Sequence, residues 1–326
     1  MKTLVTGVAG FIGFHTANRL LDRGEEVVGI DCVNDYYSVE LKNARLQKLE
    51  ARDGFRFHKL DLSDRQAYDE TRDAIAGVSR MIHLAAQAGV RHSIEHPFDY
   101  VGANLVAHMT VLELCRHQPG FEHLVYASSS SVYGGNKKLP FSVDDRTDSP
   151  VSLYAATKLA NEHMSYSYAH LYGMPQTGLR FFTVYGPWGR PDMALYIFAD
   201  AIMNGRPIEV FNHGDMKRDF TFVDDIVTGV VAAHDNPPTT SDGAPHRVYN
   251  IGNHRSEPLM RLIEILENAL GRKAEVLMKP MQLGDVKESF ADIDAIRNDL
   301  GFEPTTPIDV GVPKFVEWFK AYNGYD

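Results

Sequence analysis

Hydrophobic and polar positions alternate regularly along the first 180 residues. Short apolar and β-branched runs predict strands at residues 2–6, 26–31, 55–60, 80–86, 122–127 and 176–182. Longer stretches with helical periodicity lie between them, among them residues 14–23, 38–51, 99–117 and 152–172. This succession of strand and helix predicts an α/β fold built on a doubly wound parallel sheet.

The regular alternation ends after residue 180. Shorter strands are predicted at residues 208–211, 248–251 and 275–278, and helices at residues 224–234, 257–270, 292–300 and 308–321. Such spacing is typical of a second, smaller unit. We therefore expect residues 1–180 to form the nucleotide-binding domain. Residues 181–326 should form mainly an α/β substrate-binding lobe, with some segments returning to the first domain.

Composition narrows the class of protein. The 326 residues are 44% hydrophobic and 23% charged, as in an ordinary globular chain with ample core. We see no apolar run of membrane-spanning length, no signal peptide, and no metal or disulfide spacing at Cys32 and Cys115. We expect a cytoplasmic protein without a membrane partner or bound metal. A net charge of −10 argues against nucleic acid as a partner.

A glycine-rich turn follows the first predicted strand. Gly7, Gly10 and Gly13 have G-x-x-G-x-x-G spacing, which departs from the common G-x-G-x-x-G. They permit a tight turn, close approach of backbone to a pyrophosphate, and close packing of helix on strand. Asp31 ends the next strand about twenty residues later, where a dinucleotide ribose lies in the Rossmann fold. A carboxylate there repels a 2′-phosphate, which favours NAD over NADP.

Other candidate contacts follow later strands, because ligands of open α/β sheets lie beyond the carboxyl ends of the strands. Asp61 and Leu62 are expected near the adenine end. Ala85, Ala86 and Arg91 are expected where cofactor and substrate meet, although Arg91 is equally compatible with a surface charge.

Four consecutive hydroxyls, Ser128 to Ser131, follow the strand at residues 122–127. Serines at a strand end commonly satisfy only the backbone of a loop. From this run alone, a structural and a functional role are equally compatible with the sequence.

Tyr154 and Lys158 are four residues apart in a predicted helix with Ser152 as its N-cap, so they share a face. A phenol has a pKa of about 10, and a nearby ammonium lowers that pKa and favours a phenolate base. Such a pair is common by chance. An apolar stripe on the same helix leaves Tyr154, Lys158 and Glu162 on another face; the stripe is Leu153, Ala156, Ala160, Met164, Tyr168 and Leu171.

These motifs together resemble the extended short-chain dehydrogenase/reductase superfamily over nearly the whole chain. The resemblance rests on the three glycines, Asp31, the Tyr-x-x-x-Lys pair and two segments, residues 128–134 and 180–187. Within the superfamily the chain is similar to the nucleotide-sugar 4-epimerases that act on UDP-glucuronate. The shared segments are residues 34–37, 86–91, 180–187 and 190–194.

The resemblance implies inversion of C4 of UDP-glucuronate to UDP-galacturonate through bound NAD and a transient 4-keto sugar. Tyr154 matches the catalytic base, Lys158 the lysine that tunes it and holds the nicotinamide ribose, and Ser129 the hydroxyl at the sugar 4-OH. Besides Tyr154 and Lys158, the cofactor positions are Gly7, Gly10, Phe11, Ile12, Gly13, Asp31, Asp61, Leu62, Ala85, Ala86 and Asn104. Arg218 matches the diphosphate contact, and Phe211 and Asp285 lie in segments that hold the uridine end.

A glucuronate substrate adds a chemical hazard, because its 4-keto form is a β-keto acid that can lose carbon dioxide. We expect Ser130, Ser131, Thr183 and Arg190 to hold the carboxylate, since hydroxyls and a guanidinium suit it. Related dehydratases and decarboxylases typically carry an acid at the positions of Ser130 and Ser131. The absence of an acid at both positions in this chain favours epimerisation without dehydration or decarboxylation. Arg190 is also compatible with a surface arginine.

Three alternatives remain open at this point. A UDP-glucose 4-epimerase would not need Arg190, and a UDP-glucuronate decarboxylase would release a UDP-pentose. An NAD-binding regulatory module without catalysis usually lacks the Tyr and Lys. The resemblance further implies a homodimer that pairs through the helices at residues 99–117 and 152–172.

Overall fold

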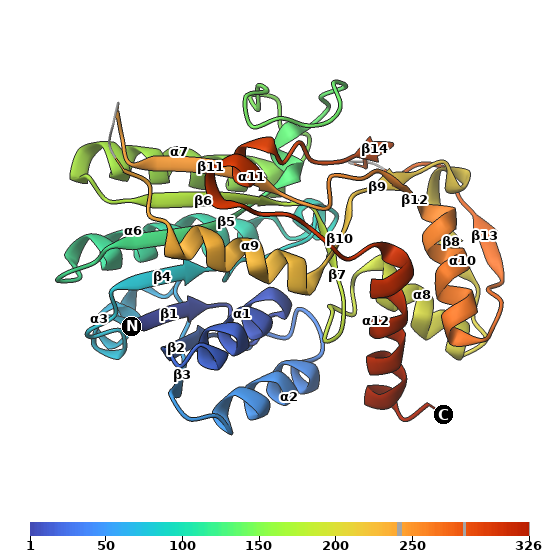
Figure 1. Cartoon of the computed structure of the whole chain (residues 1–326), viewed down its shortest axis with the longest axis horizontal. Helices are drawn as coiled ribbons and strands as arrows, with labels where there is room; N and C mark the ends of the chain where they lie inside the picture. Colours follow the sequence, from blue (N-terminus) through green and yellow to red (C-terminus); the bar gives the residue numbers. More distant parts are fainter. Residues whose placement is uncertain (240–242, 283–284, 326) are drawn as a thin grey trace.

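A seven-stranded parallel sheet forms the centre of the computed structural model, which describes residues 1–239, 243–282 and 285–325 (Figure 1). Its spatial order is β11-β6-β5-β4-β1-β2-β3, and every neighbouring pair is parallel. In chain order the strands are β1 (Lys2–Thr6), β2 (Glu26–Asp31), β3 (Phe55–Lys59), β4 (Arg80–His83), β5 (His123–Ser129), β6 (Gln176–Phe181) and β11 (His246–Ile251). The predicted α/β fold with a doubly wound parallel sheet is confirmed.

Both faces of the sheet are covered, because successive strand residues point to opposite sides. In β1, Val5 packs in the core formed with α1 (Phe11–Asp22), α2 (Val39–Glu50) and α9 (Val223–Asp235). The preceding residue, Leu4, packs in the opposite core. That core involves α3 (Tyr68–Ala74), α6 (Ala107–His117) and α7 (Leu153–Tyr172).

Helix α1 begins one turn earlier than the sequence pattern predicts. The turn after β1 closes at Gly10, whose N–H donates to the Gly7 carbonyl over 2.9 Å. Gly10 is then the N-cap, and Phe11 is already helical. The expected start at Phe14 is therefore wrong, because the glycine spacing extends into the helix.

The predicted helix over residues 99–117 is interrupted. It consists of α5 (Pro97–Tyr100), a π-helical turn η2 (Val101–Val106) and α6, and is preceded by α4 (His92–Glu95). The π turn carries the buried Asn104. Periodicity alone did not predict the π-helical turn, because the apolar spacing on both sides of it is that of an α-helix.

Helix α7 buries a different face from the one that its apolar stripe suggests. The predicted stripe is half-buried or exposed, whereas the buried positions are Ala155, Thr157, Lys158, Asn161, Glu162, Ser165 and Ala169. Polar residues can occupy this face because they have partners within the protein, such as Ser165, whose hydroxyl lies 2.9 Å from Nε2 of His108.

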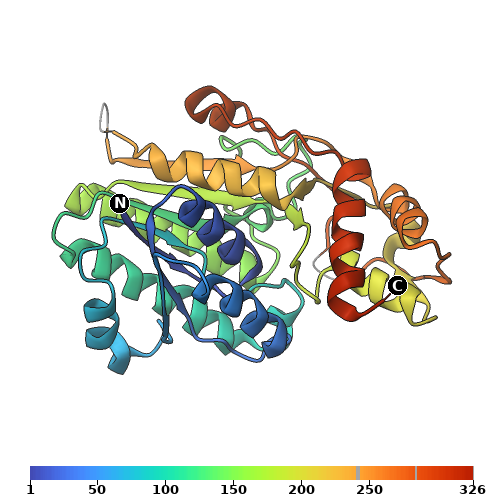
Figure 2. The same cartoon turned by 60° about the horizontal axis from the view of Figure 1, so that its bottom comes forward.

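The second lobe has its own core of large apolar side chains. Its helices are α8 (Ala194–Met203), α10 (Leu259–Leu270) and α12 (Ile308–Asn323). Its strand pairs are β7 (Thr183–Tyr185) with β10 (Phe220–Phe222) and β8 (Ile208–Val210) with β13 (Val276–Met278). A small sheet joins β9 (Lys217–Arg218), β12 (Glu257–Pro258) and β14 (Glu288–Ser289). Figures 1 and 2 both place α12 (red) between the large sheet and the rest of this lobe.

The two units are interleaved along the chain. Strand β11 pairs with β6 at the edge of the large sheet, and α11 (Asp294–Leu300) packs beside β11. The boundary at residue 180 stays a prediction. Within the residues that the structure describes, no helix is both long enough and apolar enough to cross a membrane. Cys32 and Cys115 are both free thiols.

Candidate active site

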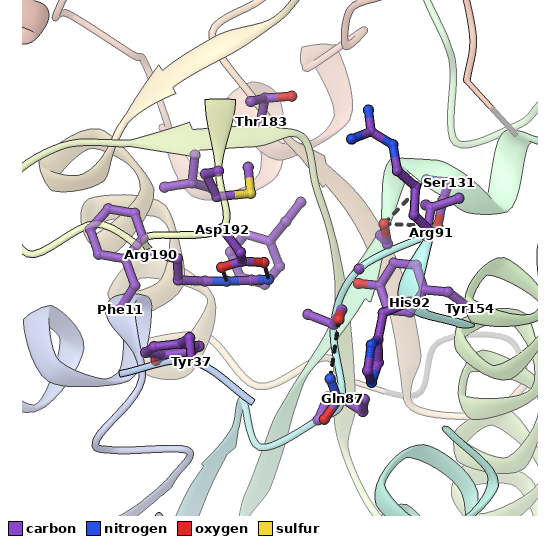
Figure 3. A pocket seen from close by; sticks show the side chains of 18 of the residues that line it. Phe11, Tyr37, Gln87, Arg91, His92, Ser131, Tyr154, Thr183, Arg190 and Asp192 are labelled. Atoms are coloured by element: carbon purple, nitrogen blue, oxygen red, sulfur yellow. Dashed lines mark hydrogen bonds and ion pairs between the residues drawn. The ribbon is translucent and has the colours of Figure 1, made fainter. Parts of the chain in front are cut away.

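A cavity of about 1380 Å³ lies beyond the carboxyl ends of β1 to β6 and reaches the second lobe (Figure 3). All the predicted site residues except Asn104 line it. On the cofactor side these are Gly7, Gly10, Phe11, Ile12, Gly13, Asp31, Asp61, Leu62, Ala85, Ala86, Tyr154 and Lys158. On the substrate side they are Arg91, Ser129, Ser130, Ser131, Thr183, Arg190, Phe211, Arg218 and Asp285.

At the turn after β1, the cavity wall is formed by backbone atoms of glycines. Gly7 has φ +69, and a Cβ there would lie 2.7 Å from the Ala85 nitrogen. A Cβ on Gly13 would lie 2.1 Å from the Gly7 carbonyl oxygen, so any side chain there would break the turn. The packing of the turn thus requires glycine, and the turn and the start of α1 line the cavity, where backbone N–H groups suit the pyrophosphate of a dinucleotide.

Asp31 ends β2 at the same wall. Its carboxylate accepts hydrogen bonds from the N–H groups of Ala9 (3.0 Å) and Val33 (2.8 Å). Burial raises the pKa of this carboxyl, while those hydrogen bonds and the charge of Lys42 lower it. Each oxygen keeps a free lone pair that can accept from a ribose hydroxyl.

Two cations near Asp31 were missed by the sequence reasoning. Lys42 Nζ donates to the Asn34 carbonyl (2.6 Å), and Arg45 donates to the carbonyls of Ala9 (2.8 Å) and Trp188 (2.6 Å). Both charges are thus engaged by backbone oxygens. The Asp31 carboxylate itself lines the cavity.

Tyr154 and Lys158 lie on one face of α7, as predicted. The Ser152 hydroxyl caps the helix by accepting from the Ala155 N–H (3.1 Å). Lys158 Nζ donates to the carbonyl of Ala127 (2.9 Å), and burial lowers the pKa of Lys158 to about 8. The ammonium is therefore fixed against β5.

The expected lowering of the Tyr154 pKa by Lys158 is wrong for this arrangement. Burial raises the pKa of the Tyr154 phenol, and the opposing influences are hydrogen bonding with Ser129 and the charge of Arg190. Desolvation of the phenolate outweighs both. The ammonium instead has a backbone carbonyl as its partner.

All four serines line the cavity, and Ser128 and Ser129 also form structural hydrogen bonds. Strand β5 continues through Ser129, so Ser128 lies within the sheet and donates to Glu162 (2.5 Å). The Ser129 hydroxyl accepts from the N–H (3.2 Å) and the hydroxyl (2.9 Å) of Ser131. It therefore caps the 3₁₀ turn η3 (Ser130–Tyr133) and also faces the cavity.

A buried polar network holds α7 against the sheet. Arg180 forms two hydrogen bonds with Glu162 (2.9 and 2.8 Å), and the two side chains are 6% and 7% exposed. Arg180 also donates to the hydroxyl of Tyr133 (2.9 Å), which donates to Asn250 (2.6 Å). The network fixes the helix that carries Tyr154.

Asn104 is buried and does not line the cavity, so its role as a cofactor contact stays a prediction. Its side chain accepts from the Gln87 N–H (2.8 Å) and donates to the Gln87 carbonyl (3.0 Å) and the Thr157 hydroxyl (3.0 Å). It thus positions Gln87, one of the residues of the loop after β4 that line the cavity.

Arg190 lines the cavity but has an internal partner. Its Nε lies 3.0 Å from Oδ1 of Asp192, and a second guanidinium nitrogen also bonds this carboxylate. The Tyr36 hydroxyl donates to Asp192 as well (3.2 Å). Figure 3 shows this group beside Phe11, on the opposite side of the cavity from Tyr154 and Ser131.

The residues predicted to bind the nucleotide come from both lobes and lie together at one end of the cavity. Arg91 pairs with Asp285 (3.4 Å), and its guanidinium lies 5.4 Å from the ring centroid of Phe211. Arg218 donates to the carbonyls of Lys217 (2.8 Å) and Lys287 (3.1 Å). Two guanidinium groups and an aromatic face thus line one end of the cavity.

Asp192 and Tyr36 are site residues that the sequence reasoning did not single out. Both lie in segments that carried the resemblance, residues 34–37 and 190–194, but no spacing rule links them. Their contact joins the loop after β2 to the loop after β7. This contact depends on the tertiary structure, and no local sequence pattern predicts it.

Known proteins share this fold. A family model described as "NAD dependent epimerase/dehydratase family" matches residues 3–252. A protein of Rhizobium meliloti (strain 1021) named "Probable UDP-glucuronate 4-epimerase" is 48% identical over 332 residues, covering 98% of this chain and 97% of the relative.

Solved structures of two sugar-nucleotide epimerases match over almost the full length. UDP-glucuronic acid 4-epimerase from Bacillus cereus, in complex with UDP-glucuronic acid and NAD, has a TM-score of 0.90 at 33% identity, covering 99% of this chain and 100% of that one. UDP-glucose 4-epimerase from Thermotoga maritima has a TM-score of 0.87 at 27% identity, with the same coverage.

Proposed function

Because the chain belongs to the NAD dependent epimerase/dehydratase family, we propose that it is an NAD-dependent nucleotide-sugar epimerase that inverts C4 of UDP-glucuronate to give UDP-galacturonate. One observation carries the proposal. The same cavity is lined by a glycine wall, the Tyr154 and Lys158 pair, and a set of hydroxyls with Arg190 that suits a carboxylate.

Two features of the chain fit NAD. The glycine turn exposes backbone at the cavity wall, and the Asp31 carboxylate has lone pairs that can accept further hydrogen bonds. Gly7, Gly10 and Gly13 leave room for the pyrophosphate, Asp31 accepts from the adenosine ribose, and Lys158 lies at the nicotinamide end. Bound NAD supplies the group that takes the C4 hydride and later returns it.

Tyr154 serves as the base for the sugar 4-OH. The phenol must lose its proton first, and the two influences that lower its pKa, the Ser129 hydroxyl and the Arg190 charge, favour that loss. Ser129 lies next to the phenol and orients the reacting hydroxyl. The buried network behind α7 keeps both groups at a fixed distance from the sugar.

The substrate carboxylate is held by hydroxyls and a guanidinium. Ser130, Ser131 and Thr183 supply hydrogen-bond donors, and Arg190, which lies across the cavity from Ser131, supplies charge from the other side of the sugar. Holding the carboxylate prevents alignment of its C5 bond with the C4 carbonyl. Neither Ser130 nor Ser131 can act as a carboxylic acid at C5, which supports epimerisation without loss of carbon dioxide.

UDP-glucose 4-epimerisation is the second candidate. It is favoured by the pairing of Arg190 with Asp192, since a neutral sugar would leave that ion pair intact. The test is to incubate the purified protein, without added cofactor, with each UDP-sugar and to identify the product by NMR. UDP-galacturonate from UDP-glucuronate supports the proposal. UDP-pentose as the main product, or turnover of UDP-glucose alone, contradicts it.

The proposal includes a cytoplasmic homodimer. Exposed apolar side chains on α6 and α7 support pairing through these two helices. Leu171 of the α7 stripe is 66% exposed, Tyr166 beside the stripe is 51% exposed, and Met109 on α6 is 38% exposed. The free thiols of Cys32 and Cys115 support a reducing compartment. Size-exclusion chromatography with light scattering tests the dimer; a monomer mass contradicts it.

A further inference from the structure

Two histidines and an aspartate gather at the rim of the cavity. His92 in α4, His96 between α4 and α5, and Asp99 in α5 each offer a ligand atom, and these atoms all lie within 4.8 Å of one another. Among the residues that the structure describes, this is the one such group of three. Neither His96 nor Asp99 lines the cavity, so the proposed reaction does not use them.

We propose that His92, His96 and Asp99 bind one divalent transition-metal ion of the Zn²⁺ class. Bonds from Zn²⁺ to histidine nitrogen and carboxylate oxygen are about 2.0–2.2 Å long, so ligand atoms of a tetrahedral site lie roughly 3.5 Å apart. Nε2 of His92 is already 3.5 Å from Oδ2 of Asp99. Imidazole and carboxylate are the ligand types that such ions select.

The third ligand needs only a side-chain rotation. The rings of His92 and His96 are stacked with centroids 4.2 Å apart, and His96 is exposed, so its ring can turn toward the pair. Pro97 follows directly and starts α5, which places Asp99 on the same side as the histidines. The ion keeps at least one position for water, because the chain supplies three ligands.

The site is open to solvent yet attached to the cavity. Asp99 is 57% exposed and His92 is 26% exposed. On its other side the His92 ring contacts Tyr36, with ring centroids 4.8 Å apart, and His92 lines the cavity near Tyr154 (Figure 3). An ion can therefore enter from water and fix a ring that borders the substrate.

Occupation of the site should affect binding of the sugar. Tyr36 donates to Asp192, the partner of Arg190, and Arg91 directly precedes His92. A metal that fixes His92 thus constrains side chains on two sides of the substrate. This consequence rests on the proposed function, and we expect it as a higher KM for UDP-glucuronate at similar kcat.

The test is a titration of untagged protein with Zn²⁺ by calorimetry, without any sugar. We expect one ion per chain, and His96→Asn and Asp99→Asn should each weaken binding by at least about tenfold. His117→Asn is the matched control, because His117 also lies 3.5 Å from a carboxylate, that of Glu113, without a second histidine. It should not change the affinity.

Two outcomes would overturn the site: no binding of Zn²⁺, or equal affinity in the wild type and His96→Asn. The kinetic arm compares the KM for UDP-glucuronate with and without Zn²⁺. A rise of at least about twofold in the wild type but not in His96→Asn supports the link to the cavity, and an unchanged KM refutes it. If the protein turned over no UDP-sugar, the calorimetry would still decide the metal site.

Discussion

The two sides of the cavity differ in how their polar groups are held. On the cofactor side, Lys158 is fixed by the Ala127 carbonyl and Asp31 by two backbone N–H groups. On the substrate side, Arg190 and Arg91 are each paired with a carboxylate, Asp192 or Asp285, at the cavity surface. These two cofactor-side groups are tied to the backbone, and these two substrate-side arginines are tied through side chains, whereas Arg218 is held by backbone carbonyls.

This difference bears on how each side receives its ligand. Backbone partners do not move, so the cofactor side can keep its geometry when a dinucleotide binds. Side-chain carboxylates can be replaced by an incoming anion of the same charge, and partly exposed ion pairs contribute only about 0–1 kcal/mol. We infer that the substrate side exchanges internal acids for the substrate's own carboxylate and phosphates.

The largest expected effect lies on the cofactor side, at the reacting hydroxyl. Tyr154→Phe should lower kcat by about 10²- to 10⁴-fold, because a positioned acid–base group contributes this much. The bound NAD should remain, as measured by its absorbance after denaturation. Tyr168→Phe, on the same helix but outside the cavity, where the phenol donates to Glu113 on α6, is the control and should retain activity. Wild-type turnover in Tyr154→Phe would remove the phenol from the mechanism.

The rigidity of that side can be tested in the buried network. Glu162→Gln leaves the Arg180 charge buried without a carboxylate, which should lower the free energy of unfolding by about 3–5 kcal/mol. Glu264→Gln, in the exposed pair with Arg261, should change it by less than about 0.5 kcal/mol. Denaturant unfolding measures both. Equal effects would show that the fixed side of the cavity is not stabilised by this pair.

Glu162 also shows which feature of α7 the sequence did not predict. The periodicity predicted α7, its N-cap Ser152 and the shared face of Tyr154 and Lys158, because these depend on residues close in sequence. It did not identify the buried face, because the partners of the buried Glu162 are Arg180 on a later strand and Ser128 on an earlier one. A polar side chain carries no local sign of a distant partner.

The two sides of the cavity also differ in how well the sequence predicts them. Gly7, Gly10, Gly13 and Asp31 could be predicted from strand–turn–helix order, since backbone geometry demands them. Arg190 could be placed in the site by resemblance, but its partner Asp192 could not, nor could the contact with Tyr36 across two loops. The hydrogen bonds of Asn104 with Gln87 could not be predicted for the same reason, since they arise from tertiary packing.

The next prediction concerns charge on the substrate side. Arg190→Ala should lower kcat/KM for UDP-glucuronate by about 10- to 100-fold, because a hydrogen bond to a charged group contributes about 1.5–3 kcal/mol. Turnover of UDP-glucose should fall much less. Arg261→Ala, on α10 outside the cavity, is the control. Unchanged kcat/KM for UDP-glucuronate would sink the carboxylate assignment of Arg190.

The smallest expected effect is also the sharpest test of exchangeable partners. Asp192→Asn removes the charge that competes for Arg190, so the KM for UDP-glucuronate should fall, by up to about fivefold, as a lost ion pair of about 0–1 kcal/mol permits. UDP-glucose, which has no carboxylate, should show no such gain. Asp285→Asn is the matched comparison, because it frees Arg91 at the nucleotide end and should affect both sugars equally. A higher KM in Asp192→Asn would mean that Asp192 holds Arg190 in place for the substrate, and the two sides of the cavity would then be equally fixed.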